Sequence, residues 1–229
     1  MIAEKMIPFV QNNSAIRTMF EEGNRLKKKY GADKVFDFSL GNPSVPAPDC
    51  VREAIIDLVN SEEPAVLHGY MNNAGFEDVR EVIAQSLNRR FGTSFSAKNL
   101  IMTVGAASGL NVILKTILNP GEEVIVFAPY FLEYGAYVKN YDGKLIEVSP
   151  DTDTFQPNLQ ELKEKITVNT RAVIVNTPHN PTGVVYSEET IRALTSILEE
   201  KQREFGNVIY LISDEPYREL AYDGVKVPY

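Results

Sequence analysis

The sequence has 229 residues, 44% of them hydrophobic, which is enough for one principal domain with a sizeable core. Its formal net charge of −8 argues against nucleic acid and anionic membranes as partners. Cys50 is the single cysteine, which excludes a disulfide within the chain, and no continuous apolar stretch at the N-terminus indicates a signal peptide or membrane span, so we expect a cytoplasmic protein.

Helices are predicted first along the chain. Residues 1 to about 35 predict an arm followed by a helix, and the proline-rich stretch 42–48 links them to a second helix over 49–60. We expect Asn73 to open a third helix that runs toward Gly92. Its apolar residues recur at helical spacing, namely Phe76, Val79, Val82, Ile83 and Leu87.

A strand is predicted over residues 99–104, followed by a turn of small residues, Gly105-Ala106-Ala107-Ser108-Gly109, and then a helix. A turn of this kind presents free backbone N–H groups to an anion, with the helix dipole assisting, and phosphate is the expected anion. The turn is neither a Walker loop nor a dinucleotide fingerprint. Close packing of a helix against a sheet explains its small residues equally well.

Strands are next predicted over residues 122–127 and 144–148, with a helix over 131–140 between them. A buried strand over 172–175 leads into Asn176-Thr177-Pro178-His179-Asn180-Pro181-Thr182-Gly183. Asn180 precedes a proline, which keeps it out of the helical region and holds its amide at the end of the strand. The same loop could simply reverse the chain.

The last predicted elements are a helix capped by Ser187 and ending near Gly206, and a buried strand over residues 208–213. Asp214-Glu215-Pro216-Tyr217 follows this strand, at the edge where open α/β sheets bind ligands. A carboxylate near low dielectric requires a cationic or hydrogen-bonded partner, although an ordinary turn or helix cap is the alternative. The alternation predicts an α/β fold of three layers, a mostly parallel sheet with helices on both faces.

Taken in order, these segments resemble the class I/II aminotransferases, which are fold type I pyridoxal-phosphate enzymes related to aspartate aminotransferase. The resemblance covers nearly the whole chain. It is carried by Ser39-Leu40-Gly41-Asn42-Pro43, His68-Gly69-Tyr70, Gly75, Arg80, Gly105-Ala106-Ala107, Pro129-Tyr130-Phe131, Asn180-Pro181-Thr182-Gly183 and Asp214-Glu215-Pro216-Tyr217. It implies a small-domain part over 1–48 and a cofactor-binding large domain over 49–229.

The resemblance also implies roles for individual residues toward pyridoxal 5'-phosphate. Asp214 would keep the pyridine nitrogen protonated, so that the ring can take up electrons. Asn180 and Tyr217 would both hydrogen-bond the phenolic oxygen and favour its ionised form. The backbone N–H groups of Ala106 and Ala107, with the Ser108 hydroxyl, would hold the phosphate.

Three further residues match family positions. Phe131 would stack on the cofactor ring, with the neighbouring Tyr130 as the alternative. Tyr70 would reach the phosphate of the other subunit of a homodimer. Gly41 would lie near the substrate carboxylate, where any side chain would intrude. Asn180 would also face the substrate.

The chain departs from the family pattern at the lysine that forms a Schiff base with the cofactor. Only Lys226 follows Asp214, without the serine pattern that precedes the family's lysine, and Lys98 in Ser94-Phe95-Ser96-Ala97-Lys98 precedes the phosphate turn. Neither is expected to be the catalytic lysine. The chain is therefore expected to be the N-terminal part of a longer enzyme and to be inactive alone.

The predicted function of the parent protein is transfer of an amino group from an amino acid to a 2-oxo acid. The alternatives are a carbon–sulfur lyase of the same fold and a non-catalytic regulator that binds pyridoxal phosphate. No metal site is expected, because the two histidines, His68 and His179, have no second imidazole or cysteine at ligand spacing.

Overall fold

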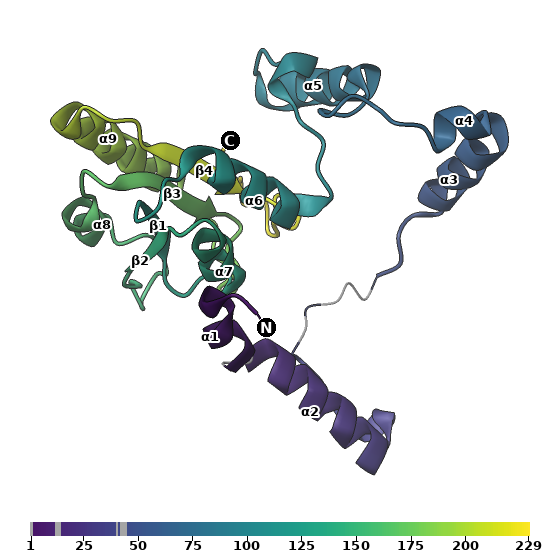
Figure 1. Ribbon diagram of the computed structural model, residues 1–229, viewed down its shortest axis with the longest axis horizontal. Coiled ribbons are helices and arrows are strands. Elements are labelled where there is room, and N and C mark those ends of the chain that lie inside the picture. The colour runs from purple at the N-terminus through teal and green to yellow at the C-terminus, as the bar shows by residue number, and fades with distance from the viewer. Residues whose placement is uncertain (1, 12–14, 40, 42–44) are drawn as a thin grey trace. The chain divides into compact units, whose positions relative to one another are not determined.

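The computed structural model describes residues 2–11, 15–39, 41 and 45–229 and divides into two compact units, Met1–Tyr70 and Met71–Tyr229. The first unit is helical (Figure 1). Its helices are confirmed where the sequence predicts them over residues 1–35 and 49–60. They are η1 (Glu4–Met6), α1 (Ile7–Gln11), α2 (Ala15–Tyr30), η2 (Ala32–Lys34), α3 (Asp49–Ser61) and α4 (Pro64–Leu67).

The second unit contains a sheet of four parallel strands in the order β2-β1-β3-β4. The strands are β1 (Glu123–Phe127), β2 (Lys144–Val148), β3 (Thr170–Asn176) and β4 (Tyr210–Asp214). The helices of this unit are α5 (Glu77–Phe91), η3 (Ala97–Asn99), α6 (Gly105–Ile117), α7 (Glu133–Asn140), α8 (Leu159–Lys165) and α9 (Glu188–Phe205). The predicted α/β class, a parallel sheet with helices, is confirmed.

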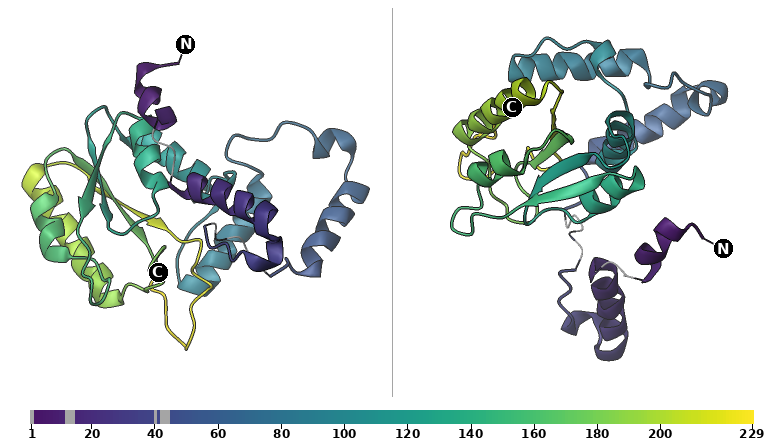
Figure 2. Two further views of the ribbon diagram at one scale, coloured as in Figure 1. Left: turned by 90° about the horizontal axis from the view of Figure 1, so that it is seen from below. Right: turned by 60° about the vertical axis from the view of Figure 1, so that its left-hand side comes forward.

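The two faces of the sheet are covered by different helices, as Figures 1 and 2 show. Because side chains alternate along a strand, Val124 and Val126 of β1 pack with α6 and α7, whereas Ile125 and Phe127 pack with α8 and α9. Adjacent positions of β3 divide in the same way. Burial of both faces explains why β1 is apolar at four consecutive positions.

The chain leaves β1 toward β2 on one side and returns from β2 to β3 on the other side, so the strand order reverses between β1 and β3. In open α/β sheets, ligands bind outside the carboxyl ends of the strands at such a reversal. The segments that follow β1, β3 and β4 therefore lie at the edge of the sheet where a ligand site is expected.

Two predicted strands require correction. Residues 100–104 form no strand in the structure. Ile101 and Val104 are exposed there, and Met102 N–H bonds the Ala74 carbonyl instead of a neighbouring strand. The strand predicted over 208–213 is β4, but it is not fully buried. It pairs only with β3 within the described residues and therefore keeps Tyr210 48% exposed.

The predicted start of the helix at Asn73 is also wrong, because α5 begins at Glu77. Asn72 accepts the Ala74 N–H in a turn, and Gly75 has a φ of 93°, which a helix cannot contain. The predicted end at Gly92 is confirmed, with Gly92 in the left-handed conformation at the C-cap. The turn at Asn72–Gly75 therefore moves the start of this helix to Glu77, while its predicted helical character is confirmed.

Candidate functional site

Two polar residues end neighbouring strands of the sheet. Asn176 is the last residue of β3 and Asp214 the last of β4, and the two are register partners. Both strands are parallel, so both side chains are delivered to the same edge. This is the edge at which the sequence predicts a ligand site.

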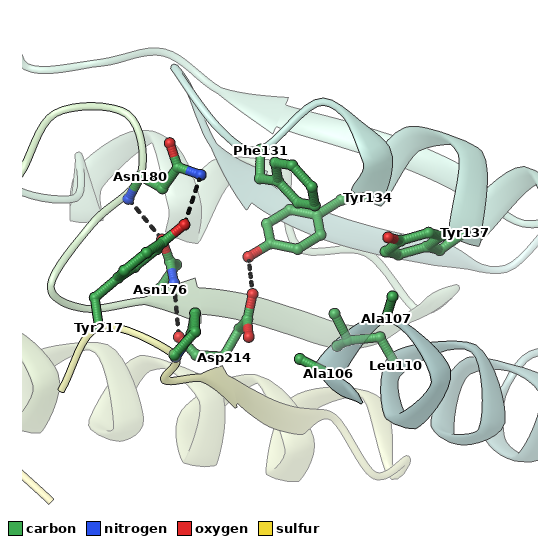
Figure 3. Close-up of a pocket in the computed structure, with 11 residues that line it drawn as sticks. Ala106, Ala107, Leu110, Phe131, Tyr134, Tyr137, Asn176, Asn180, Asp214 and Tyr217 are labelled. Atoms are coloured by element: carbon green, nitrogen blue, oxygen red, sulfur yellow. Dashed lines mark hydrogen bonds between the residues drawn. The ribbon is translucent and has the colours of Figure 1, made fainter. Parts of the chain in front are cut away.

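A cavity of about 150 Å³ opens at this edge (Figure 3). It receives residues from α6, from the segment after β1, and from the ends of β3 and β4. Its lining consists of Ala106, Ala107, Leu110, Phe131, Tyr134, Tyr137, Asn176, Asn180, Asp214, Pro216 and Tyr217. Apolar and aromatic groups thus surround a small set of polar groups, as is usual for small-molecule sites.

Asp214 is the carboxylate of the cavity and is half-buried. Burial raises its pKa, the hydrogen bond from Tyr134 lowers it, and the charge of the neighbouring Glu215 raises it. The Tyr134 hydroxyl donates to Asp214 Oδ2 at 2.6 Å. In the described part of the chain no cation pairs with Asp214. Of the two kinds of partner expected for this carboxylate, a cation or a hydrogen-bond donor, the structure provides a hydrogen-bond donor, Tyr134.

Asn176 connects the loop after β3 to the end of β4. Its side-chain amide donates to the Asp214 carbonyl at 2.7 Å, and its Oδ1 accepts the Asn180 backbone N–H at 2.6 Å. The Asn180 side chain in turn donates to the Tyr217 hydroxyl oxygen at 3.2 Å. These bonds bring an amide and a phenol to one wall of the cavity, as Figure 3 shows.

Two aromatic side chains, Phe131 and Tyr134, form another part of the lining. Phe131 and Tyr134 meet edge to face, with ring centroids 5.6 Å apart. Tyr130, the alternative to Phe131, is not a lining residue, and its hydroxyl donates to Glu147 at 2.6 Å. The structure therefore places Phe131 at the cavity and directs Tyr130 to β2.

The first turn of α6 contributes Ala106 and Ala107 to the cavity. Gly105 has a φ of 78°, a conformation that favours glycine, and it is the first residue of α6. The turn predicted over residues 105–109 is therefore not separate from the helix, because these residues form its beginning. The N–H groups of a first helical turn have no partner within the helix. Ser108 is half-buried and lies outside the set of lining residues.

The cavity thus brings together six of the residues predicted for the site, namely Asp214, Asn180, Tyr217, Phe131, Ala106 and Ala107. Gly41 and Tyr70 belong to the first unit, where Tyr70 is exposed and a Cβ at Gly41 would meet nothing within 4 Å. Their predicted roles stay predictions. Leu40, Asn42 and Pro43 of the matched motif lie outside the described residues.

Sequence reasoning assigned no site role to five lining residues, the polar Tyr134, Tyr137 and Asn176 and the apolar Leu110 and Pro216. The signal for the tyrosines was present, because residues 131, 134 and 137 are aromatic at a spacing of three, which aligns them on one helix face. Asn176 carried a weaker signal as the polar residue that ends a buried strand.

Lys98 lies in η3, Lys226 is exposed in the segment after β4, and neither lines the cavity. Across the described ranges, no group of three or more His, Cys, Asp or Glu side chains is arranged to hold a metal ion. None of the helices described by the structure is both long and apolar enough to cross a membrane.

Comparison with known proteins identifies related sequences. A family model described as aminotransferase class I and II matches residues 33–228. A probable aspartate/prephenate aminotransferase of Thermus aquaticus is 36% identical over 201 residues, covering 86% of this chain and 49% of the relative. Aspartate aminotransferase of Pyrococcus horikoshii is 29% identical over 226 residues, which cover 98% of this chain and 53% of the relative. The chain spans about half the length of these curated relatives.

Solved structures agree with these sequence matches. An aminotransferase from Eubacterium rectale shares 44% identity with a TM-score of 0.96, covering all of this chain and 58% of that chain. The aspartate aminotransferase of Thermus thermophilus with maleate shares 30% identity with a TM-score of 0.83. The match covers 99% of this chain and 56% of that chain.

Proposed function

The chain belongs to the class I and II aminotransferases, which depend on pyridoxal phosphate, and on this premise we propose that it forms the cofactor site of an enzyme that transfers an amino group from an amino acid to a 2-oxo acid. One observation supports this most directly. Asp214, Asn180, Phe131 and the first turn of α6 line the same cavity, although they come from four separate segments.

The residues present fit the proposed cofactor. An aromatic ring that carries a basic nitrogen, a phenolic oxygen and a phosphate needs an acid, hydrogen-bonding groups, an apolar wall and an anion site. Asp214 supplies the acid, Asn180 and Tyr217 supply the hydrogen-bonding groups, and Phe131 supplies part of the apolar wall. The start of α6 supplies backbone N–H groups with a favourable dipole.

Pyridoxal phosphate, when bound, supplies a ring that accepts electrons from a bond breaking at the α-carbon of an amino acid. Asp214 would hold a proton on the ring nitrogen, and Asn180 and Tyr217 would bond the phenolic oxygen. Ala106 and Ala107, with the Ser108 hydroxyl, would bind the phosphate. Phe131 would pack against one face of the ring and fix its tilt.

The remaining assignments concern the whole protein. We assign Gly41 and Asn180 to the substrate, and Tyr70 to the cofactor phosphate of the second subunit in a cytoplasmic homodimer, on the resemblance of their motifs to the family. We further propose that these 229 residues alone bind the cofactor without turnover. The support is that no described lining residue is a lysine and that the curated relatives are about twice as long.

The relatives named above are called aminotransferases, which favours amino transfer over carbon–sulfur lysis. Product analysis of the protein that carries this chain separates the two reactions. A 2-oxo acid accompanied by a new amino acid indicates transfer. Ammonia, pyruvate and a thiol indicate a lyase and would overturn the proposed reaction.

Binding is tested by titrating the chain with pyridoxal phosphate and following the absorbance of the cofactor. We expect a saturable spectral change that Asp214→Asn weakens by about tenfold or more, because a hydrogen bond to a charged group is lost. Asp223→Asn is the matched control, since Asp223 is exposed and its φ of 55° suits asparagine. No saturable change, or equal affinities in all three proteins, contradicts the proposal.

A further inference from the structure

We propose that Tyr134 is a positioning residue that orients both Asp214 and Phe131 for the cofactor. Its hydroxyl holds the carboxylate, and its ring supports the phenyl group. The inference rests on the proposed function, because it concerns how the site is arranged toward pyridoxal phosphate. It assigns a role to Tyr134, which lies outside the motifs that carry the resemblance to the family.

Tyr134 is itself firmly fixed. Its side chain is 2% exposed and packs in the core cluster beneath α7, beside Val126 of β1 and Ile174 of β3. The ring therefore cannot turn without disturbing the core that joins α7 to the sheet. A hydroxyl on such a ring is a stationary donor for its partner.

The bond from Tyr134 constrains a side chain that is otherwise free to turn. The last torsion of an aspartate is broad, so backbone position alone does not orient the carboxylate. Tyr134 donates to Asp214 Oδ2 at 2.6 Å. Among the described residues Asp214 Oδ1 accepts no hydrogen bond, and Asp214 lines the cavity. One oxygen is held by the protein and the other remains available to a ligand.

The ring of Tyr134 has a second function. It meets Phe131 at an interplanar angle of 86° and lies nearly parallel to Tyr130, at 13° and a centroid distance of 6.5 Å. Edge-to-face contact of this kind favours a defined ring orientation. Phe131 is thus oriented by the same side chain that holds Asp214, as Figure 3 shows.

The charges around Asp214 make its response to Tyr134 predictable. Segments packed around it present few titratable groups: Tyr134 and Tyr137 from α7, and Glu215 and Tyr217 after β4. β3 contributes the neutral Asn176, and α6 contributes only Ala106, Ala107 and Leu110. Burial and Glu215 both raise the Asp214 pKa, and Tyr134 opposes them. Loss of the Tyr134 hydroxyl should therefore raise this pKa further.

The test compares Tyr134→Phe with Tyr130→Phe. Each substitution removes one tyrosine hydroxyl that donates to a carboxylate at 2.6 Å, but only Tyr134 contacts Asp214. The carboxyl signal of Asp214 is followed by carbon-13 NMR in the cofactor-free chain and identified by its loss in Asp214→Asn. We expect a higher Asp214 pKa in Tyr134→Phe and no change in Tyr130→Phe. An unchanged pKa in Tyr134→Phe, or equal changes in both variants, overturns the inference.

Titration with pyridoxal phosphate provides the second readout. In Tyr134→Phe we expect binding to be weaker by about tenfold at neutral pH, and the acidic limb of the binding profile to move to higher pH with the Asp214 pKa. A raised Asp214 pKa with unchanged cofactor binding overturns the positioning role alone. Failure of the unsubstituted chain to bind the cofactor overturns the proposed function and the positioning role together.

Discussion

Asn176 donates its side-chain amide to the backbone carbonyl of Asp214, its register partner on the adjacent parallel strand, at 2.7 Å. The same side chain accepts the Asn180 N–H at 2.6 Å. One buried asparagine, 4% exposed, therefore ties the carboxylate-bearing end of β4 to the loop that carries Asn180.

Replacing this asparagine should destabilise the fold. Asn176→Ala leaves the Asp214 carbonyl and the Asn180 N–H without their partner, and we expect the free energy of unfolding to fall by about 1–3 kcal/mol. Urea unfolding measures the loss. Asn169→Ala is the control, because Asn169 is exposed and should change stability by less than about 0.5 kcal/mol. Equal losses in the two variants would contradict the role of Asn176.

His179 should make stability depend on pH. Its side chain is 6% exposed, its ring stacks on Tyr186 with centroids 5.5 Å apart, and burial lowers its pKa below the ordinary value of 6.5. Below about pH 6.5 the unfolded chain therefore binds a proton that the folded chain resists, so the free energy of unfolding falls as the pH falls. Urea unfolding at several values between about pH 7.5 and about pH 5.5 measures this slope.

The second histidine provides the control for this slope. His68 is exposed, so His68→Gln should leave the pH dependence unchanged, whereas His179→Gln should reduce it. If both variants keep the pH dependence of the unsubstituted chain, His179 is not its source.

Ser187 should stabilise α9 through its cap. Its hydroxyl accepts the Thr190 N–H at 3.0 Å, and Glu188 and Glu189 follow in the first turn. Ser187→Ala should lower the free energy of unfolding by about 1 kcal/mol, measured by urea unfolding. Ser196→Ala, on an exposed position within the same helix, should cause no such loss. Comparable destabilisation by both substitutions would show that the cap is not responsible.

Local signals in the sequence predicted much of this fold because they act over a few residues. Ser187 and Gly206 bracket α9 as expected, and the apolar runs at β1 and β3 are buried strands. The helix predicted after residue 104 is α6, although it already begins at Gly105 and includes the small residues that were predicted as a turn. In each case the determining interaction is a hydrogen bond or a packing preference between neighbours in the chain.

Long-range partners decided what these signals could not. Residues 100–104 have a strand-like composition but form no strand, because no neighbouring chain pairs with them in the described structure. β4 has the apolar run of a buried strand but pairs only with β3.

The sequence by itself placed Asp214 and Asn180 at the ligand edge, because the end of a strand is a local property and both residues come after apolar runs. Only the tertiary structure decided how those residues are held. Tyr134 is 80 positions from the carboxylate it bonds, and Asn176 is 38 positions from the carbonyl it bonds. Such pairings depend on strand order and helix packing, which bring distant segments together, so the local sequence does not identify the partner of each residue.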